Sequence, residues 1–275
     1  MPGSVGADHE LAVQAFCAST LESSQSTFVL TKTETPVYTT VLERIIDHAD
    51  TIRVLDLSST VIGSLGASEL AKVLRCCGLL EGLNLSGCLI KSEGVWSIQA
   101  ELLACTRLVK LNLDDNRIGP YGAEMLAAIL PSCASLKNVH LSRNRIGDAG
   151  VMTLARKLPK CASLEHLNLA WNRIGHDGAF SLARILDQCP PLRILDLNSN
   201  CLGDAGAFLL TFGLKQPCTS VNRLDLSVNN ITTHRQKMLT QHVPCQYPNL
   251  PMHKLILRRP QADDCACSAR DRACD

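Results

Sequence analysis

Two histidines and a pair of adjacent aspartates near the middle of the chain have the side chains that a metal site or an acid–base catalyst would need. His140 and His166 lie on neighbouring predicted strands, so their imidazoles could share a metal ion. A zinc site takes three or four protein ligands, and no clear third ligand accompanies the two histidines. Asp114 and Asp115 have no matched acid or nucleophile nearby. We therefore predict no metal, no cofactor and no catalytic residue here, and interpret these side chains as polar surface residues.

Other sequence signatures of catalysis are weak or missing. Cys265, Cys267 and Cys274 near the C-terminal end could suggest zinc, but three cysteines without a CxxC pair or a nearby histidine are a poor match to known sites. The chain contains no phosphate-binding loop, nucleophile elbow or HExxH motif. We predict that the protein is not an enzyme and has no small-molecule substrate.

Trp171 and Arg143 could serve recognition instead of catalysis. Tryptophan and arginine side chains supply much of the binding energy at protein interfaces. Arg143 stands 28 residues before Trp171, and Asp115 stands 28 residues before Arg143. These three side chains could form a docking patch flanked by His140 and His166. The alternative is a surface tryptophan that simply lies over its own turn.

The elements that must position these side chains recur along the chain. A Leu-x-Leu core repeats, with five steps of 28 residues followed by steps of 29 and 31. A period of this length predicts a solenoid, in which each unit adds one strand and one helix and is stable only when stacked on its neighbours. The copies start at Leu55, Leu83, Leu111, Val139, Leu167, Leu195, Leu224 and Leu255.

Each copy opens with a short strand that ends near an asparagine. In the copy spanning residues 136–164, Val139 and Leu141 are expected to point into the core. Asn138 and His140 then lie on the other face. A buried side-chain amide at the strand end can bond to turn backbones and join the copies as a ladder, which is a structural role. The ladder residues are Asn116, Asn144, Asn172, Asn200 and Asn229.

A turn of small residues, as in 146–150, follows the asparagine and leads into a helix with apolar residues at 3.6-residue spacing. Asp148 and Asp204 are expected to cap their own helices. The small residues are expected to let the helix approach the sheet closely. Helices are about 10 Å wide and strands in a sheet are about 4.8 Å apart, so stacked units must curve with the strands inside.

The pattern LxxLxLxxNxIGxxGAxxLAxxLxxCxxL, found in Leu108–Leu136 and Leu164–Leu192, resembles the leucine-rich repeat of the ribonuclease-inhibitor-like class. The resemblance extends over residues 28–257. It implies an α/β fold, a curved solenoid or horseshoe with a parallel sheet on the concave face and helices on the convex face. The family includes ribonuclease inhibitors, activators of the Ran GTPase, innate-immune sensors and ciliary or cytoskeletal scaffolds, so it specifies the fold more closely than the function.

Three parts are predicted along the chain. An N-terminal helical or flexible segment covers residues 1–26, the repeat solenoid with capping units at both ends covers 27–259, and a polar tail, expected to be disordered, covers 260–275. The solenoid is expected to begin with a degenerate strand at 28–30 and to end with a strand at 255–257.

Some copies depart from the pattern. Thr60 and Cys88 replace the asparagine in the first two full copies, so looser turns are expected there. Pro244, Pro248 and Pro251 are expected to break the segment that follows the copy starting at Leu224.

Composition excludes several partners. Lys and Arg number 27 against 26 Asp and Glu, so no charge footprint for nucleic acid or an anionic membrane is expected. No apolar run approaches 18 residues, and the start, MPGSVGADHE, lacks the features of a signal peptide. Six cysteines share the repeat period, which favours a free-thiol core ladder, a reducing compartment and a cytoplasmic protein. They are Cys77, Cys105, Cys133, Cys161, Cys189 and Cys218.

These patterns favour a non-catalytic scaffold that binds a protein partner on its concave face. The resemblance implies two alternatives, a GTPase-activating protein for a Ran-like small GTPase and a ribonuclease inhibitor. Family analogy also suggests a cytoskeletal, ciliary or flagellar assembly. The predicted partner-binding residues are Asp114, Asp115, His140, Arg143, His166, Asn168, Trp171 and Asn198.

Overall fold

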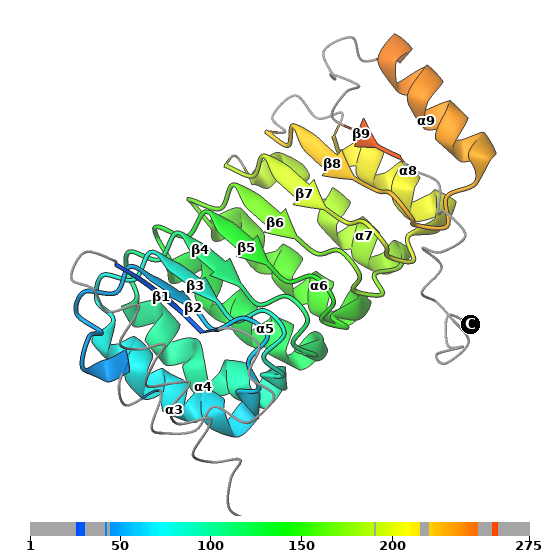
Figure 1. Cartoon of the computed structure of the whole chain (residues 1–275). Helices are drawn as coiled ribbons and strands as arrows, with labels where there is room; N and C mark the ends of the chain where they lie inside the picture. Colours follow the sequence, from blue (N-terminus) through cyan, green and yellow to red (C-terminus); the bar gives the residue numbers. More distant parts are fainter. Residues whose placement is uncertain are drawn as a thin grey trace, which may run out of the picture.

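The computed structural model describes residues 26–30, 42, 45–189, 191–214, 220–246 and 255–257. Within these residues, nine parallel strands form one sheet in strict chain order (Figure 1). This confirms the predicted α/β solenoid. The strands are β1 (Thr27–Val29), β2 (Val54–Asp56), β3 (Gly82–Asn84), β4 (Lys110–Asn112), β5 (Asn138–His140), β6 (His166–Asn168), β7 (Ile194–Asp196), β8 (Arg223–Asp225) and β9 (Leu255–Ile256).

Helices alternate with the strands and cover one face of the sheet, which we call the convex face; the open strand side is the concave face (Figure 1). The α-helices are α3 (Gly63–Cys76), α4 (Lys91–Ala104), α5 (Gly119–Ile129), α6 (Gly147–Lys157), α7 (His176–Ala183), α8 (Gly203–Gly213) and α9 (Thr233–Gln246). Short 3-10 turns follow α5, α6 and α7 at Leu130–Ser132, Leu158–Lys160 and Leu186–Gln188.

The repeat period sets the register of the sheet. The central residue of each strand pairs with the central residue of the next, so that Leu111 pairs with Val139 and Val139 with Leu167. The two predicted end strands also pair in register, Phe28 with Leu55 and Leu224 with Leu255. The predicted copy boundaries are thereby confirmed.

The asparagine ladder is confirmed, and Asn144 illustrates it. Its side chain is fully buried, and its Oδ1 accepts hydrogen bonds from the backbone N–H groups of Asn116 at 2.9 Å and Ile118 at 3.2 Å in the preceding copy. Its Nδ2 donates to the carbonyl oxygens of Leu113 at 2.7 Å and Ser142 at 3.0 Å. One amide therefore satisfies four backbone groups across two copies, three of them buried, which is a structural role.

Thr60 and Cys88 continue the ladder with fewer bonds between copies. Both side chains are fully buried, and each donates to the carbonyl oxygen of Leu57, from Thr60 Oγ1 at 2.6 Å and from Cys88 Sγ at 3.0 Å. Ile62 N–H bonds to Thr60 O within its own turn, at 2.9 Å, and not to a side chain of the next copy.

The predicted helix caps act on a different helix from the one expected. Asp148 Oδ1 accepts the N–H groups of Gly175 at 2.6 Å and Gly178 at 3.0 Å, which start the helix of the next copy. Asp204 Oδ1 likewise accepts the N–H of Thr232, at 2.7 Å. The prediction that these aspartates cap their own helices is wrong, because stacking brings each carboxylate beside the free N–H groups of the following helix.

The small residues at the helix starts serve contacts between helices. A Cβ on Gly150 would lie 3.1 Å from Cβ of Ala123 and 3.1 Å from Cα of Pro120, both in α5. The same Cβ would lie 2.5 Å from Cγ2 of Ile146, so Gly150 permits close packing against its own turn and against the preceding helix. The sequence pattern had predicted a close approach to the sheet.

The period-sharing cysteines lie in the core wherever they are described. Cys77, Cys105, Cys161 and Cys189 are buried free thiols, and Cys133 is half-buried. Burial raises the pKa of Cys77 to about 12 and that of Cys105 to about 11. The predicted core ladder is confirmed at these positions.

The remaining predictions about the ends have mixed outcomes. Helix α9 runs through Pro244 and ends two residues later, so the predicted break at Pro244 is wrong; the loss of one N–H near the end of a helix leaves the preceding turns intact. The N-terminal helix, Cys218, Pro248, Pro251 and the tail at 260–275 lie outside the described residues.

Candidate functional site

Most of the Asp and Asn side chains that follow the central strand residues accept a hydrogen bond from the turn directly after their own strand. An Asp or Asn follows the central residue of most strands, and its Oδ1 accepts the backbone N–H two residues later, at 2.9 to 3.2 Å. This is an Asx turn, which stabilises the loop after the strand. The residues that form it are Asp56, Asn84, Asn112, Asn168, Asp196 and Asp225.

His140 occupies the equivalent place in β5 and breaks this series. The N–H of Ser142 bonds instead to Asp114 Oδ1 of the preceding copy, at 2.5 Å. Asp114 thus supplies the acceptor that an Asp or Asn at position 140 would provide. The side chain of His140 therefore does not form the Asx turn that its counterparts form in the other copies.

His140 and His166 face each other on neighbouring strands. Their ring centroids lie 5.0 Å apart in an edge-to-face arrangement, and both side chains are half-buried. Burial lowers the pKa of both imidazoles; the charge of Lys110 lowers that of His140 further, and His140 itself lowers that of His166. The pair therefore favours the neutral form, in which each ring offers one donor and one acceptor.

Arg143 and Trp171 form a second pair, in the turns that follow β5 and β6. The guanidinium carbon of Arg143 lies 4.4 Å from the Trp171 ring centroid, which is a cation–π contact. Arg143 is exposed and Trp171 is half-buried, so part of each side chain is open to solvent. The predicted association of these two side chains is present, and it fixes a flat aromatic surface at low entropic cost.

Three of the predicted docking residues share one backbone conformation in their turns. Asp115, Arg143 and Trp171 all have a positive φ, between 53° and 58°, and each donates its backbone N–H to a carbonyl oxygen of the next copy at 2.8 to 3.0 Å. The same conformation recurs at Ser59 and Ser199, so it is a structural property of this repeat and not a local mark of function.

The eight predicted residues therefore divide into two groups. The structure brings His140 beside His166 and Arg143 over Trp171, and Asp115 lies one copy before Arg143. The other three take part in turns. Asp114 accepts from Ser142, Asn168 Oδ1 accepts the N–H of Ala170 at 2.9 Å, and Asn198 Oδ1 accepts from Ser199 Oγ at 2.5 Å.

Three charged residues belong to this surface although they are absent from the predicted set. Lys110 lies close enough to lower the pKa of His140, Arg223 lowers that of His166, and Asp196 raises it. His166, Asp196 and Arg223 also line a small concavity of about 120 Å³. Their position could have identified them in the sequence, because each lies directly beside the central residue of its own strand, as His140 and His166 do.

No group of three or more potential metal-binding side chains gathers in the parts of the chain that the structure describes. In the same residues, none of the helices combines the length and the apolar character that crossing a membrane would require.

Comparison with a known repeat family agrees with the fold. The leucine-rich repeat family model matches residues 48–71, 104–127, 132–155, 160–183 and 188–210. A crystal structure of a protein from Bacteroides fragilis is similar with 14% sequence identity and a TM-score of 0.49, covering 95% of this chain and 84% of that one. No curated protein matches the chain. The first family match falls on the β2–α3 copy and the other four fall on the four successive copies from β4 to β7, and the chain is a leucine-rich repeat protein of the ribonuclease-inhibitor-like class.

Proposed function

We propose that this protein is a non-catalytic scaffold that binds a protein partner on its concave face, at a surface centred on Arg143, Trp171, His140 and His166. Leucine-rich repeat domains typically act as protein-binding scaffolds. The observation that carries the proposal is the stacking of Arg143 on Trp171 at 4.4 Å, because an ordered arginine–tryptophan pair is a favourable centre for an interface.

The histidine pair supports the same surface. His140 stands where most copies have an Asx-turn residue, and Asp114 accepts the hydrogen bond from Ser142 instead. The turn is therefore kept, and the imidazole of His140 stays on the concave face. An imidazole beside His166, between Lys110 and Asp196, can donate to or accept from a partner's polar groups.

The two alternative functions stay predictions. The GTPase activators that this repeat resembles typically have an acidic segment after the repeats, and the corresponding residues here, 260–275, lie outside the described residues. A ribonuclease inhibitor of this class would need a strongly acidic concave face, and Lys110, Arg143 and Arg223 stand among the aspartates of this one. The cytoplasmic, cytoskeletal and ciliary settings are tested by the identity of the partner.

The test is affinity purification with mass spectrometry from the native cell, comparing wild type with the Trp171→Ala, Arg143→Ala double variant. A stoichiometric partner found with wild type is then purified and titrated against both proteins. We expect the variant to bind at least about tenfold more weakly, since each anchor residue contributes on the order of 1 to 2 kcal/mol.

A matched control removes one aromatic ring and one arginine elsewhere. Tyr121 lies exposed on α5 and Arg145 lies exposed at the entry to α6, so the Tyr121→Ala, Arg145→Ala variant should bind the partner as wild type does. Thermal unfolding of all three proteins shows whether they are equally folded. Wild-type affinity in the folded Trp171→Ala, Arg143→Ala variant would reject the proposed surface.

A further inference from the structure

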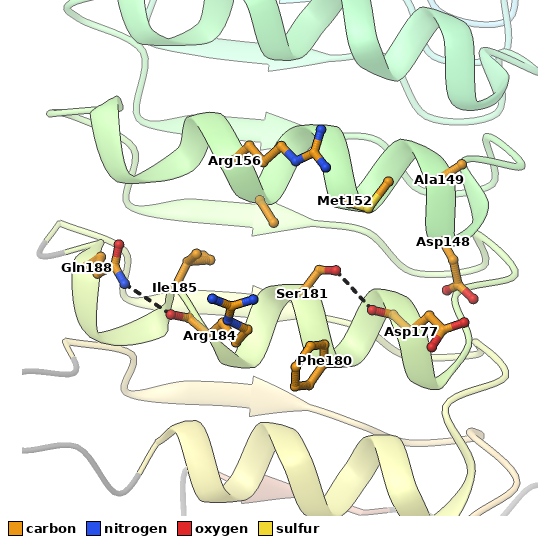
Figure 2. A pocket seen from close by; sticks show the side chains of 11 residues that line it. Asp148, Ala149, Met152, Arg156, Asp177, Phe180, Ser181, Arg184, Ile185 and Gln188 are labelled. Carbon is orange, nitrogen blue, oxygen red and sulfur yellow. Dashed lines mark hydrogen bonds between the residues drawn. The ribbon is translucent and has the colours of Figure 1, made fainter.

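A groove on the convex face separates α6 from α7 (Figure 2). Its volume is about 640 Å³, and it lies on the side of the solenoid opposite the surface proposed above. Met152 and Phe180 stand on its two walls, with 40% and 48% of their surface exposed to solvent. A methionine and a phenylalanine left in water on facing helices form an apolar surface that a partner could cover.

Charge follows the same order along both walls. On α6, Asp148, Met152 and Arg156 are spaced four residues apart, which places them in one row along the helix. Facing them, Asp177 and Phe180 lie on α7, and Arg184 follows directly after the last residue of that helix. Figure 2 shows the two aspartates together at one end of the groove, with the arginines displaced toward the other. The groove therefore runs from negative through apolar to positive.

This arrangement is specific to the α6–α7 gap among its neighbours. Arg156 and Arg184 occupy equivalent places, 28 residues apart. The corresponding residue is Ala128 on α5 and Phe212 on α8. The gap between α5 and α6 and the gap between α7 and α8 consequently have at most one arginine at this place.

The start of α7 also differs from that of α6. Gly147 donates its N–H to the carbonyl oxygen of Asn172 in the next copy at 2.8 Å, whereas Gly175 donates to Asp148 Oδ1 in the preceding copy. Gly147 has a φ of +62°, and Gly175 has an extended backbone with a φ of −96°. Helix α7 has 8 residues against 11 in α6. The groove lies where these two unlike helices meet.

We propose that the groove binds an amphipathic helix of a second protein, with acidic residues at its N-terminal end and basic residues at its C-terminal end, lying antiparallel to α6 and α7. Asp148 and Arg156 are about 12 Å apart along the helix axis, at 1.5 Å per residue, which is a little over two turns of a docked helix. In this orientation the acidic end of the partner meets Arg156 and Arg184, and its basic end meets Asp177. The helix macrodipoles also oppose each other, and acid at the N-terminus with base at the C-terminus is the charge order that stabilises the partner helix itself.

The test uses two synthetic helical peptides of identical composition and identical apolar stripe. One has Glu in its first two turns and Lys in its last two, and the other has the same Glu and Lys residues alternating along its length, so that neither orientation in the groove restores the charge order. Fluorescence anisotropy with the full-length protein at low salt should show the Glu-first peptide binding about tenfold more tightly, because the alternating peptide loses several exposed charge pairs together.

Variants of the groove sharpen the assignment. In the Arg156→Glu, Arg184→Glu protein the order of affinity should reverse or disappear, while Arg107→Glu with Arg117→Glu, two exposed arginines away from the groove, should leave it as in wild type. If the glutamate variant fails to fold, the milder Arg156→Gln, Arg184→Gln variant takes its place. It should show a smaller preference for the Glu-first peptide than wild type does. The Trp171→Ala, Arg143→Ala protein should bind the peptides as wild type does, so this result is independent of the concave surface.

Equal binding of the two peptides by wild type, no binding of either, or an unchanged preference in the folded groove variants would each overturn the proposal.

Discussion

The carboxylate of Asp114 lies 2.5 Å from the backbone nitrogen of Ser142, one repeat later in the sequence, and accepts its hydrogen bond. In other copies the equivalent N–H is satisfied by an Asp or Asn within its own copy, as Asn84 does for Ser86 at 3.2 Å. Asp114 therefore compensates for His140. The compensation keeps the turn intact while a titratable ring occupies the middle of the concave face.

Asp114→Ala should lower the free energy of unfolding by about 1 to 2 kcal/mol, because the half-buried N–H of Ser142 loses its acceptor. Adding His140→Asn should recover much of this loss, since an asparagine at position 140 can form the Asx turn found in the neighbouring copies. Urea denaturation of the four proteins of this double-mutant cycle measures the coupling. Asp115→Ala, at an exposed neighbour, serves as the control, and strictly additive losses would contradict the compensation.

The histidine pair should make stability depend on pH. Burial lowers the pKa of His140 and His166 in the folded protein, so the unfolded chain binds more protons as the pH falls below the ordinary value of about 6.5. The contribution of the pair is present above that pH and is lost as the pH falls through the folded pKa values. Unfolding free energies at pH 7.5 and pH 5.5 should differ less in the His140→Gln, His166→Gln variant than in wild type.

NMR titration of the two imidazoles gives an independent measurement of the same effect. Both should titrate below the ordinary histidine value, and His166 should titrate closer to that value once His140→Gln removes its neighbour. Titration of both rings at or above the ordinary value would show that the pair has no such influence.

Thiol reactivity should separate the exposed cysteine from its buried neighbours. Cys76 is exposed, whereas burial raises the pKa of Cys77 to about 12 and that of Cys105 to about 11. Alkylation of the native protein at pH 8 should therefore modify Cys76 well before Cys77 or Cys105, because the thiolate is the reactive form. Peptide mass spectrometry reports each site, and addition of urea should equalise them. Early modification of Cys105 in the folded protein would contradict its place in the core.

Asp148→Ala should loosen the start of the next helix. The variant removes the acceptor for the N–H groups of Gly175 and Gly178, and we expect a loss of about 1 to 2 kcal/mol in the free energy of unfolding. Hydrogen exchange should become faster at these two amides and remain as in wild type in α5. Asp177→Ala, at an exposed aspartate in the same helix start, is the matched control. Unchanged exchange at Gly175 would show that Asp148 does not cap α7.

The sequence alone was sufficient for the architecture. A period of 28 residues means that Leu111, Val139 and Leu167 must occupy the same place in successive units, and the parallel register of the sheet follows directly from that equivalence. The asparagine ladder was predictable for the same reason, since Asn116 and Asn144 are equivalent and each can reach only the turn next to it.

The candidate site was only partly predictable. Spacing by one period was enough to pair Arg143 with Trp171, and the strand alternation placed His140 on the open face. The sequence did not reveal that Asp114, Asn168 and Asn198 stabilise turns. A polar residue that stabilises a turn and one that binds a partner can be of the same residue type, and only hydrogen-bond geometry distinguishes them.

Periodicity in the sequence thus determined which residues are equivalent, because equivalence requires no more than a constant step along the chain. Only the tertiary structure decided which unlike residues meet across that step. The bond from Ser142 to Asp114 and the capping of Gly175 by Asp148 each join neighbouring units. Stacking brings such residues into contact. Which contacts form depends on the length of the side chains and on where each helix starts and ends, and the sequence of a single repeat does not specify these contacts.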